Sequence, residues 1–279
     1  MNLPEGFIFS QGSLQDFVDC RRRFQLRYLK KLAWPALETE PALEAELSLQ
    51  QGARFHRLVQ RHLLGVPAAR LASTIAGDDL ERWWQNYLEF YKDPTGPVGR
   101  PGSLYPEISF TAALGKTRLE AKIDLVVVLP EGRAVIYDWK TSRHRPERRW
   151  LARRLQTRLY PYLLARAGAP LNAGQSLPPE GIEMVYWFAG HPDQPERFAY
   201  SAQAYQEDEA YLSDLIGTIL RLGEEDFPLT SDVRRCAYCV YRSLCERGTR
   251  AGDLEGMEEE PGEEPAFEVD FDQIAEIEF

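Results

Sequence analysis

The sequence predicts an α/β fold in which a central mixed sheet is flanked by helices. Residues 117–129 alternate apolar and polar side chains as a strand does, residues 10–32 place apolar side chains at helical spacings, and further segments of both kinds follow along the chain. The chain has 279 residues, 44% of them hydrophobic, which is enough for one good core but not for several independent domains. We expect one main domain, residues 1–250, and a tail, residues 251–279.

Helices dominate the first hundred residues. The spacing predicts a helix pair over residues 10–32, with Ser10 or Ser13 as its N-cap and Cys20 at its middle. Two more helices are expected in a helical insertion at about 34–100. One runs from about residue 40 to 64, and the other from about 78 to 91 with Asp78 or Asp79 as its cap.

A β-hairpin is predicted after the turn-rich stretch DPTGPVGRPG. One apolar face of its first strand comprises Leu119, Ala121, Ile123, Leu125, Val127 and Leu129. Polar residues, among them Lys122 and Asp124, form the other face. A turn at residues 130–132 returns the chain as RAVIYDWKTS, where Asp138 and Lys140 share a face because they are two residues apart.

Helices and strands alternate in the remainder of the domain. An arginine-rich helix is expected over about 147–167, and it places Gln156 and Tyr160 four residues apart on one face. Strands follow at 182–188 and near 197–200, and a last helix is expected over about 204–222.

The acidic residues concentrate in the tail. The net charge is −10, but residues 251–279 contain 12 Asp and Glu and no Lys or Arg, which leaves 31 acidic against 33 basic residues in the main domain. We expect this tail to be disordered. It could be a solvating appendage, a DNA mimic lying across a basic groove, or a peptide that binds a partner, and its periodic Phe and Ile residues favour the last two.

No stretch of the sequence has the length and apolarity of a membrane span, and the first residues lack the features of a signal peptide. We therefore expect a cytoplasmic protein with no membrane partner.

Acidic residues on adjacent strands are the strongest candidate site. Asp124 and Asp138 can approach one point, which like charges tolerate if a cation such as Mg²⁺ or Mn²⁺ lies between them. Lys140 would point into the same site, and Glu107 or His56 could complete it. Each charge alone could be an ordinary solvent-facing residue, but Asp138 between Tyr137 and Trp139 needs a partner.

Cysteines occur at four positions, Cys20, Cys236, Cys239 and Cys245. In a cytosolic chain, a C-x2-C-x5-C group favours metal binding over disulfides. Four thiolates suit either tetrahedral zinc or a [4Fe–4S] cluster. If all four bind one centre, that centre ties the two ends of the fold together.

In combination these motifs resemble the RecB-like branch of the PD-(D/E)XK nucleases, which includes the AddB nuclease domain and CRISPR-associated adaptation nucleases. The matching motifs are Gly52-x3-His56, Asp124, Asp138-Trp139-Lys140, Gln156-x3-Tyr160, and Cys20 with the later cysteine group. The resemblance spans residues 13 to 245. It implies a restriction-endonuclease-like fold and Mg²⁺- or Mn²⁺-dependent hydrolysis of DNA.

The same resemblance implies roles for individual residues. His56, Asp124, Asp138 and the Trp139 carbonyl would be metal ligands, and Lys140 would be the catalytic lysine. Gln156 and Tyr160 would position the DNA or support the site, while Glu107 occupies the place of an auxiliary acid. The cysteines would hold an iron–sulfur cluster that clasps the two ends of the domain, with zinc as the alternative.

A run of arginines follows the predicted catalytic lysine, and it comprises Arg143, Arg145, Arg148, Arg149 and Arg153 among others. These side chains could hold DNA phosphates, although such runs also form solvated helix faces. We expect single-stranded DNA or DNA ends as substrate, exonuclease activity in repair, recombination or defence, and a helicase or other partner for the tail. The alternative is a non-catalytic scaffold that binds DNA or a helicase.

Overall fold

A six-stranded mixed sheet forms the centre of the computed structural model, which describes residues 3–4, 6–32, 40–99, 101–142, 145–236 and 239–248. The strands run in the order β1-β3-β4-β5-β6, and β2 pairs with β3 off this path. Their bounds are β1 Ile8–Ser10, β2 Ser103–Leu114, β3 Thr117–Leu129, β4 Arg133–Lys140, β5 Ile182–Phe188 and β6 Glu196–Ala199. The β1–β3 and β4–β5 pairs are parallel and the others are antiparallel, so the predicted mixed sheet is confirmed.

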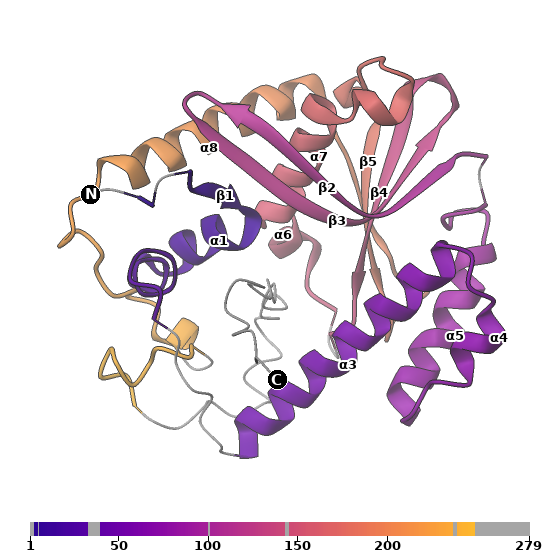
Figure 1. The fold of residues 1–279 in the computed structure, drawn as a ribbon, viewed down its shortest axis with the longest axis horizontal. Helices are drawn as coiled ribbons and strands as arrows, with labels where there is room; N and C mark the ends of the chain where they lie inside the picture. The colour runs from indigo at the N-terminus through magenta and orange to yellow at the C-terminus, as the bar shows by residue number, and fades with distance from the viewer. Residues whose placement is uncertain are drawn as a thin grey trace, which may run out of the picture.

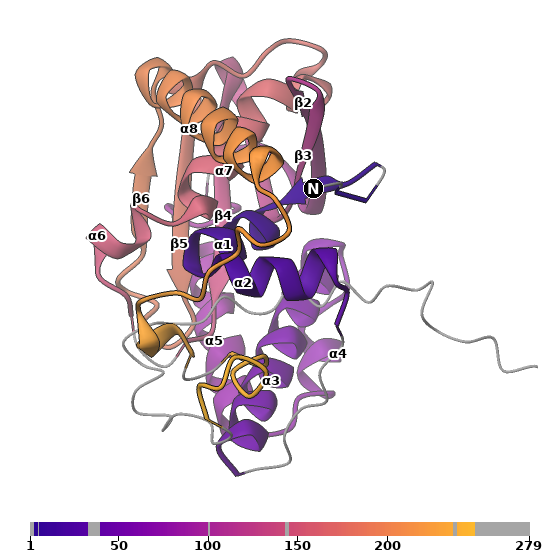
Figure 2. The ribbon, with the colours of Figure 1, turned by 90° about the vertical axis from the view of Figure 1, so that its left-hand side faces the viewer.

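Helices cover both faces of the sheet (Figures 1 and 2). One face packs against α1 (Gln11–Asp19), α7 (Leu155–Ala167) and α8 (Ala202–Arg221). The other face packs against α3 (Glu40–Leu63), α4 (Ala68–Ala72) and α5 (Asp78–Lys92). Strands β4 and β5 send alternate side chains into these two cores, and their apolar residues are buried on both sides.

The apolar face of β3 changes sides at Asp124, so the prediction of one continuous apolar face over residues 119–129 is wrong. Leu119 and Ile123 pack with α1 and α7, whereas Leu125 packs on the α3–α5 side. The change coincides with Glu107 on the neighbouring strand β2, whose backbone has a φ of 51°. A residue with left-handed backbone reverses the faces to which the following side chains of a strand point. The β2–β3 pairing is interrupted at the same place, because Glu107 and Asp124 do not pair.

Several predicted helices are confirmed within a few residues, including the first, whose N-terminus is capped as expected. Ser13 donates its backbone N–H to Ser10 Oγ at 3.1 Å, and Ser10 returns a backbone bond to Ser13 Oγ at 3.0 Å. Cys20, however, has an extended backbone that ends α1. The chain continues as α2 (Arg21–Phe24) and a π-helical turn, Gln25–Leu29.

Two details of the predicted helices are wrong. The N-cap of α5 is Gly77, and Asp78 and Asp79 lie in the first turn, where their charges favour the helix dipole. The predicted arginine-rich helix over 147–167 consists of two helices, α6 (Arg148–Leu151) and α7, because the backbone of Arg154 is extended with a ψ of 144°. Short 3-10 turns occupy Pro130–Gly132, Ala169–Asn172, Pro179–Gly181 and Val233–Cys236.

The predicted disordered tail, residues 251–279, lies outside the described residues, as does the start of the predicted insertion at 34–39. Within the described ranges, no helix combines the length and apolarity needed to cross a membrane.

Candidate active site

Asp124 and Asp138 lie where strands β3 and β4 stop pairing. The described β3–β4 ladder ends at the pair of Leu125 with Tyr137, and the next pair in this register would be Asp124 with Asp138. Instead, the Trp139 backbone N–H donates to Asp124 Oδ2 at 2.8 Å. A side-chain carboxylate therefore replaces a backbone carbonyl, which holds Asp124 beside the end of β4.

Asp138 is almost fully buried and is surrounded by the other residues of its predicted motif. The exposed fraction of its residue is 3%. Lys140 Nζ lies 3.0 Å from Asp138 Oδ2, and Gln156 Nε2 donates to Asp138 Oδ1 at 3.3 Å. Lys140 also donates to Gln156 Oε1 at 3.1 Å, and the Gln156 amide reaches the Tyr160 hydroxyl at 3.2 Å. The structure thus brings these four predicted residues into one network.

Burial raises the pKa of two groups in this network. Burial raises the pKa of Asp138 to about 6, against the lowering effect of Lys140, and the charge of Asp124 raises it further. Burial and the two aspartates also hold the pKa of Tyr160 well above its usual value. Asp124 and His56 both act on the pKa of Asp138, so all three belong to one electrostatic site.

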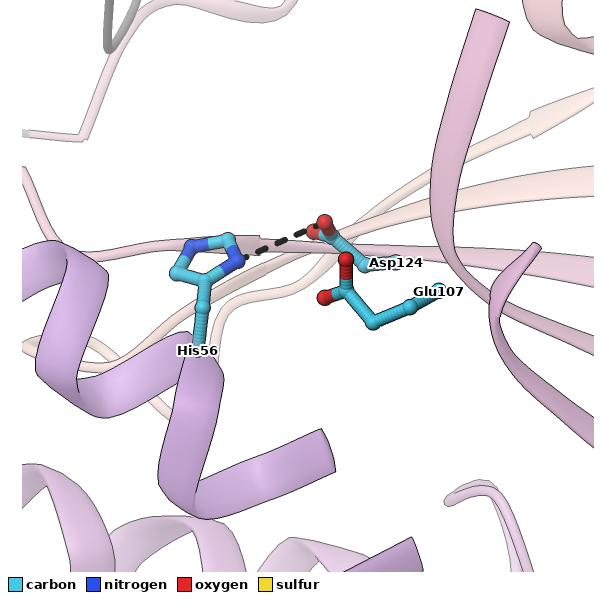
Figure 3. Close-up of side chains that lie close together, drawn as sticks. All are labelled: His56, Glu107 and Asp124. Carbon is cyan, nitrogen blue, oxygen red and sulfur yellow. Dashed lines mark ion pairs between the residues drawn. The ribbon is translucent and has the colours of Figure 1, made fainter. Parts of the chain in front are cut away.

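His56, Glu107 and Asp124 form a group that could hold a metal ion (Figure 3). One potential ligand atom from each residue lies within 4.8 Å of the other two, and His56 Nδ1 is 3.3 Å from Asp124 Oδ1. Helix α3 supplies the histidine, while β2 and β3 supply the acids. The sequence suggested Glu107 or His56 as the additional ligand, and the structure places both beside Asp124.

Glu107 is held in this group by an uncommon backbone conformation. Its positive φ is rare for a residue with a side chain, and such outliers concentrate at functional sites. Lys122 Nζ lies 2.6 Å from Glu107 Oε2, a contact that the sequence analysis did not anticipate. Burial and the neighbouring Asp124 raise the pKa of Glu107. A bound cation would favour its charged form instead.

The donor set fits a hard divalent cation. Carboxylate oxygens are the ligands that Mg²⁺ prefers, and an added imidazole also suits Mn²⁺. Two acids and a histidine meet at one point, and the buried Asp138 lies beside them. The Trp139 side chain is buried in the α3–α5 core, and its backbone N–H bonds to Asp124 beside this site.

The predicted DNA-binding arginines have different environments. Arg145 and Arg148 both pair with Glu196 of β6, Arg148 at 2.7 Å, and this glutamate is 8% exposed. Arg149 pairs with Glu147 at the surface, and Arg153 is exposed. Arg143 lies outside the described residues. Arg145, Arg148 and Arg149 of the predicted DNA-binding set therefore form ion pairs within the protein.

All four cysteines line one pocket, although they are far apart in the sequence. Cys20 comes from the junction of α1 and α2, and the others come from the C-terminal segment that lies beside it (Figure 2). Their sulfur atoms do not form a compact group: among the described residues, no three cysteines come within 4.8 Å of one another. Burial raises the pKa of the Cys236, Cys239 and Cys245 thiols.

Comparisons with known proteins agree with this fold. The model of the PD-(D/E)XK nuclease superfamily matches residues 8–246, a range that includes every predicted site residue and all four cysteines. No curated protein matches the chain.

Two solved structures align with most of the chain. A candidate exonuclease from Eubacterium rectale gives a TM-score of 0.54 at 12% identity, covering 91% of this chain and 93% of that one. The protein SSO0001 gives a TM-score of 0.38 at 16% identity, covering 89% and 90%, and carries no further argument. The likeness to the first structure concerns the fold, and with the family match it confirms the predicted restriction-endonuclease-like architecture. The chain therefore belongs to the PD-(D/E)XK nuclease superfamily.

Proposed function

We propose that this protein hydrolyses phosphodiester bonds of DNA with the help of Mg²⁺ or Mn²⁺. The observation that carries the proposal is the convergence of His56, Glu107 and Asp124 next to the buried Asp138 and its partner Lys140. His56, Asp124, Asp138 and the Trp139 carbonyl would hold the ion, with Glu107 as the auxiliary acid. A bound divalent cation would supply charge neutralisation at the phosphate and a more acidic water.

Lys140 would assist the attacking water or the developing negative charge on the phosphate. Two contacts keep its ammonium group in place, one to Asp138 Oδ2 at 3.0 Å and one to Gln156 Oε1 at 3.1 Å. Gln156 therefore orients both Asp138 and Lys140, and Tyr160, from the same helix, holds the Gln156 amide. This arrangement makes Gln156 and Tyr160 supports of the site, with the DNA strand as a further contact.

The substrate is proposed to be single-stranded DNA or DNA with a free end, cut as an exonuclease in repair, recombination or defence in the cytoplasm. Superfamily membership supports a nuclease, and the E. rectale neighbour is described as a candidate exonuclease. Arg148, Arg149 and Arg153 are exposed, but Arg148 pairs with the buried Glu196, so Arg149 and Arg153 are the first candidates for phosphate contacts. The acidic tail is proposed to bind a helicase or another partner.

The cysteines are proposed to hold a [4Fe–4S] cluster, as in the RecB-like branch of the superfamily. All four cysteines line one pocket, and the C-x2-C-x5-C spacing with a remote first cysteine resembles the cluster ligation of that branch more than the paired C-x2-C groups of zinc ribbons. The centre would act mechanically, by joining the end of α1 to the C-terminal segment.

A cleavage assay tests the proposed function. End-labelled single- and double-stranded DNA would be incubated with the wild type and with Asp138→Asn and Lys140→Met, in Mg²⁺, Mn²⁺ or EDTA. We expect metal-dependent cleavage by the wild type and loss of at least about 1,000-fold in both variants. Lys116→Met, at the exposed β2–β3 turn, is the matched control and should cut normally.

Wild-type protein that binds DNA but cuts none with either metal would contradict the proposal and favour the scaffold alternative. Cleavage retained in both motif variants would remove this site from the reaction.

A further inference from the structure

Gln15 is a buried glutamine on α1 that lies outside all the predicted motifs. Its residue is 5% exposed, and its side-chain amide bonds at both ends. The carbonyl oxygen accepts from the backbone N–H of Leu155 at 3.3 Å, and the amide nitrogen donates to Asp19 Oδ1 at 3.0 Å. One side chain thus joins two segments that are 140 residues apart.

The contact with Leu155 supplies a cap that α7 otherwise lacks. Leu155 is the first residue of α7, and the first N–H groups of a helix have no partner within it. The N-cap residue is Arg154, whose side chain carries no hydrogen-bond acceptor and makes no capping bond. Gln15 therefore satisfies from α1 one of the free N–H groups at the start of α7, at the first position, whereas a Ser or Asp N-cap would satisfy one at the second or third.

The capped turn of α7 carries the support of the candidate active site. Gln156 directly follows Leu155, and its amide contacts both Asp138, at 3.3 Å, and Lys140, at 3.1 Å. These contacts require the first turn of α7 to keep its position relative to β4. The Leu155 N–H that bonds to Gln15 directly precedes Gln156, the residue whose side chain makes these contacts.

The other end of Gln15 leads to the cysteine pocket. Asp19 pairs with Arg23, whose Nη2 is 2.9 Å from Asp19 Oδ2, and with Arg235, the residue before Cys236. Both arginines line the pocket that the four cysteines share. A continuous set of polar contacts therefore runs from the cysteine pocket through Asp19 and Gln15 to the start of α7.

We propose that Gln15 is a positioning residue, which fixes the first turn of α7 and thereby holds Gln156 against Asp138 and Lys140. The polar contacts through Asp19 make the cysteine-lined pocket the anchor for this arrangement. This inference rests on the proposed nuclease function for its kinetic consequence, but its structural consequence at α7 is independent of that function.

The two hydrogen bonds of Gln15 determine which substitutions can test its role. Methionine has nearly the shape of glutamine but no strong acceptor or donor, so Gln15→Met should remove both bonds. Glutamate keeps an oxygen for the Leu155 N–H but loses the donor to Asp19 and places a second carboxylate against it. The double variant Gln15→Glu/Asp19→Asn reverses the direction of that bond, because the asparagine amide can donate to the glutamate, and it keeps the net charge. It should therefore rescue most of what Gln15→Met loses.

Hydrogen exchange of a peptide covering residues 152–160 tests the structural consequence. We expect at least about 10-fold faster exchange at the start of α7 in Gln15→Met, because the amide has lost its acceptor. Gln15→Glu/Asp19→Asn should stay within about 3-fold of the wild type. Gln85→Met, at an exposed glutamine of α5, is the matched control and should leave this peptide unchanged.

Turnover by the same proteins tests the kinetic consequence. We expect kcat to fall between about 10-fold and about 100-fold in Gln15→Met with little change in KM, since a displaced catalytic group slows the chemical step. In a Gln156→Ala background the same substitution should cost less than about 2-fold, because both changes act through one side chain.

Unchanged exchange in Gln15→Met, full additivity with Gln156→Ala, or a Gln15→Glu/Asp19→Asn protein as impaired as Gln15→Met would each overturn the inference. If Gln15→Met does not fold, Gln15→Glu/Asp19→Asn decides alone: near-wild-type exchange and turnover support the role of the acceptor, and impairment of both contradicts it. A wild type without nuclease activity would count against the proposed function, and the exchange result would still decide the role of Gln15.

Discussion

The backbone nitrogen of Trp139 lies 2.8 Å from Oδ2 of Asp124, so a side chain of β3 continues the pairing with β4 after the backbone ladder has ended. The other oxygen of the same carboxylate faces His56 Nδ1 at 3.3 Å. Asp124 is therefore oriented from two sides before any ligand binds. This geometry fixes the acid at the centre of the candidate metal site.

The Asp124→Asn substitution removes the charge of Asp124 but keeps an acceptor for its hydrogen bond with Trp139. Asp124→Asn can still accept the Trp139 N–H, so we expect a folded protein whose affinity for Mn²⁺ falls by more than about 100-fold. Titration calorimetry with Mn²⁺ measures this change, with the exposed Asp193→Asn as control. Equal affinities in the two variants would mean that the ion binds elsewhere.

Metal-free protein should be stabilised by removal of the Asp138 charge at neutral pH. The folded-state pKa of about 6 lies above the usual value of 3.8, so this group contributes stability below pH 4 that is lost as pH rises through 6. Asp138→Asn should therefore raise the free energy of unfolding at pH 7.5 by up to about 3 kcal/mol. Urea unfolding in EDTA at pH 7.5 and pH 4 provides the measurement.

The expected gain of stability should disappear at pH 4, where Asp138 is already protonated. A variant that is less stable than the wild type at pH 7.5 would show that the contacts with Lys140 and Gln156 outweigh burial of the charge.

The left-handed backbone of Glu107 should distinguish two substitutions that both remove the carboxylate. Glycine adopts a positive φ without steric cost, so Glu107→Gly should be more stable than Glu107→Ala by about 1–2 kcal/mol. Thermal unfolding of the two variants tests this order. An alanine variant as stable as the glycine variant would argue that the strand does not keep this conformation.

Arg153 should contribute to DNA binding through phosphate contact alone. We expect Arg153→Ala to reduce the slope of log K against log salt by about 0.7 for single-stranded DNA, without a change in stability. Arg145→Ala should instead lower stability, because it removes a partner of the buried Glu196. Fluorescence anisotropy in a salt series separates the two effects, and an unchanged slope in Arg153→Ala would exclude that contact.

The proposed iron–sulfur cluster predicts the same result for cysteines at opposite ends of the chain. Cys20→Ser and Cys245→Ser should each remove the visible absorbance of anaerobically purified protein, since both line one pocket. Absorbance and iron content are measured together. Colourless wild-type protein with one zinc ion per chain would establish the alternative centre.

Local sequence patterns predicted most helices and strands of this fold, because the spacing of apolar residues within a segment depends on the conformation of that segment. The strand over residues 117–129 and the Ser10 cap are read within a few residues, and both predictions agree with the structure. The reversal of the β3 face at Asp124 could not be predicted in this way, because it accompanies a positive φ at Glu107 on another strand. The break at Arg154 was missed because arginine-rich segments are good helix formers.

The candidate site was predicted in part for the same reason. Asp138 and Lys140 share a strand face, and Gln156 and Tyr160 share a helix face, so spacing alone places each pair. Gln15 carries no such signal, since its partners Leu155 and Asp19 are brought together only by the packing of α1 on α7. Lys122 was placed beside Asp124 by strand periodicity, but its partner Glu107 lies on the neighbouring strand.

The location of a bound Mn²⁺ ion tests the central claim most directly. Anomalous scattering from crystals soaked in MnCl₂ would show the ion's position without reference to activity. We predict a peak within ligand distance of His56 and Asp124, at the point where β3 and β4 separate. A well-ordered site with no peak there, in crystals of protein that cuts DNA with Mn²⁺, would contradict the proposed site.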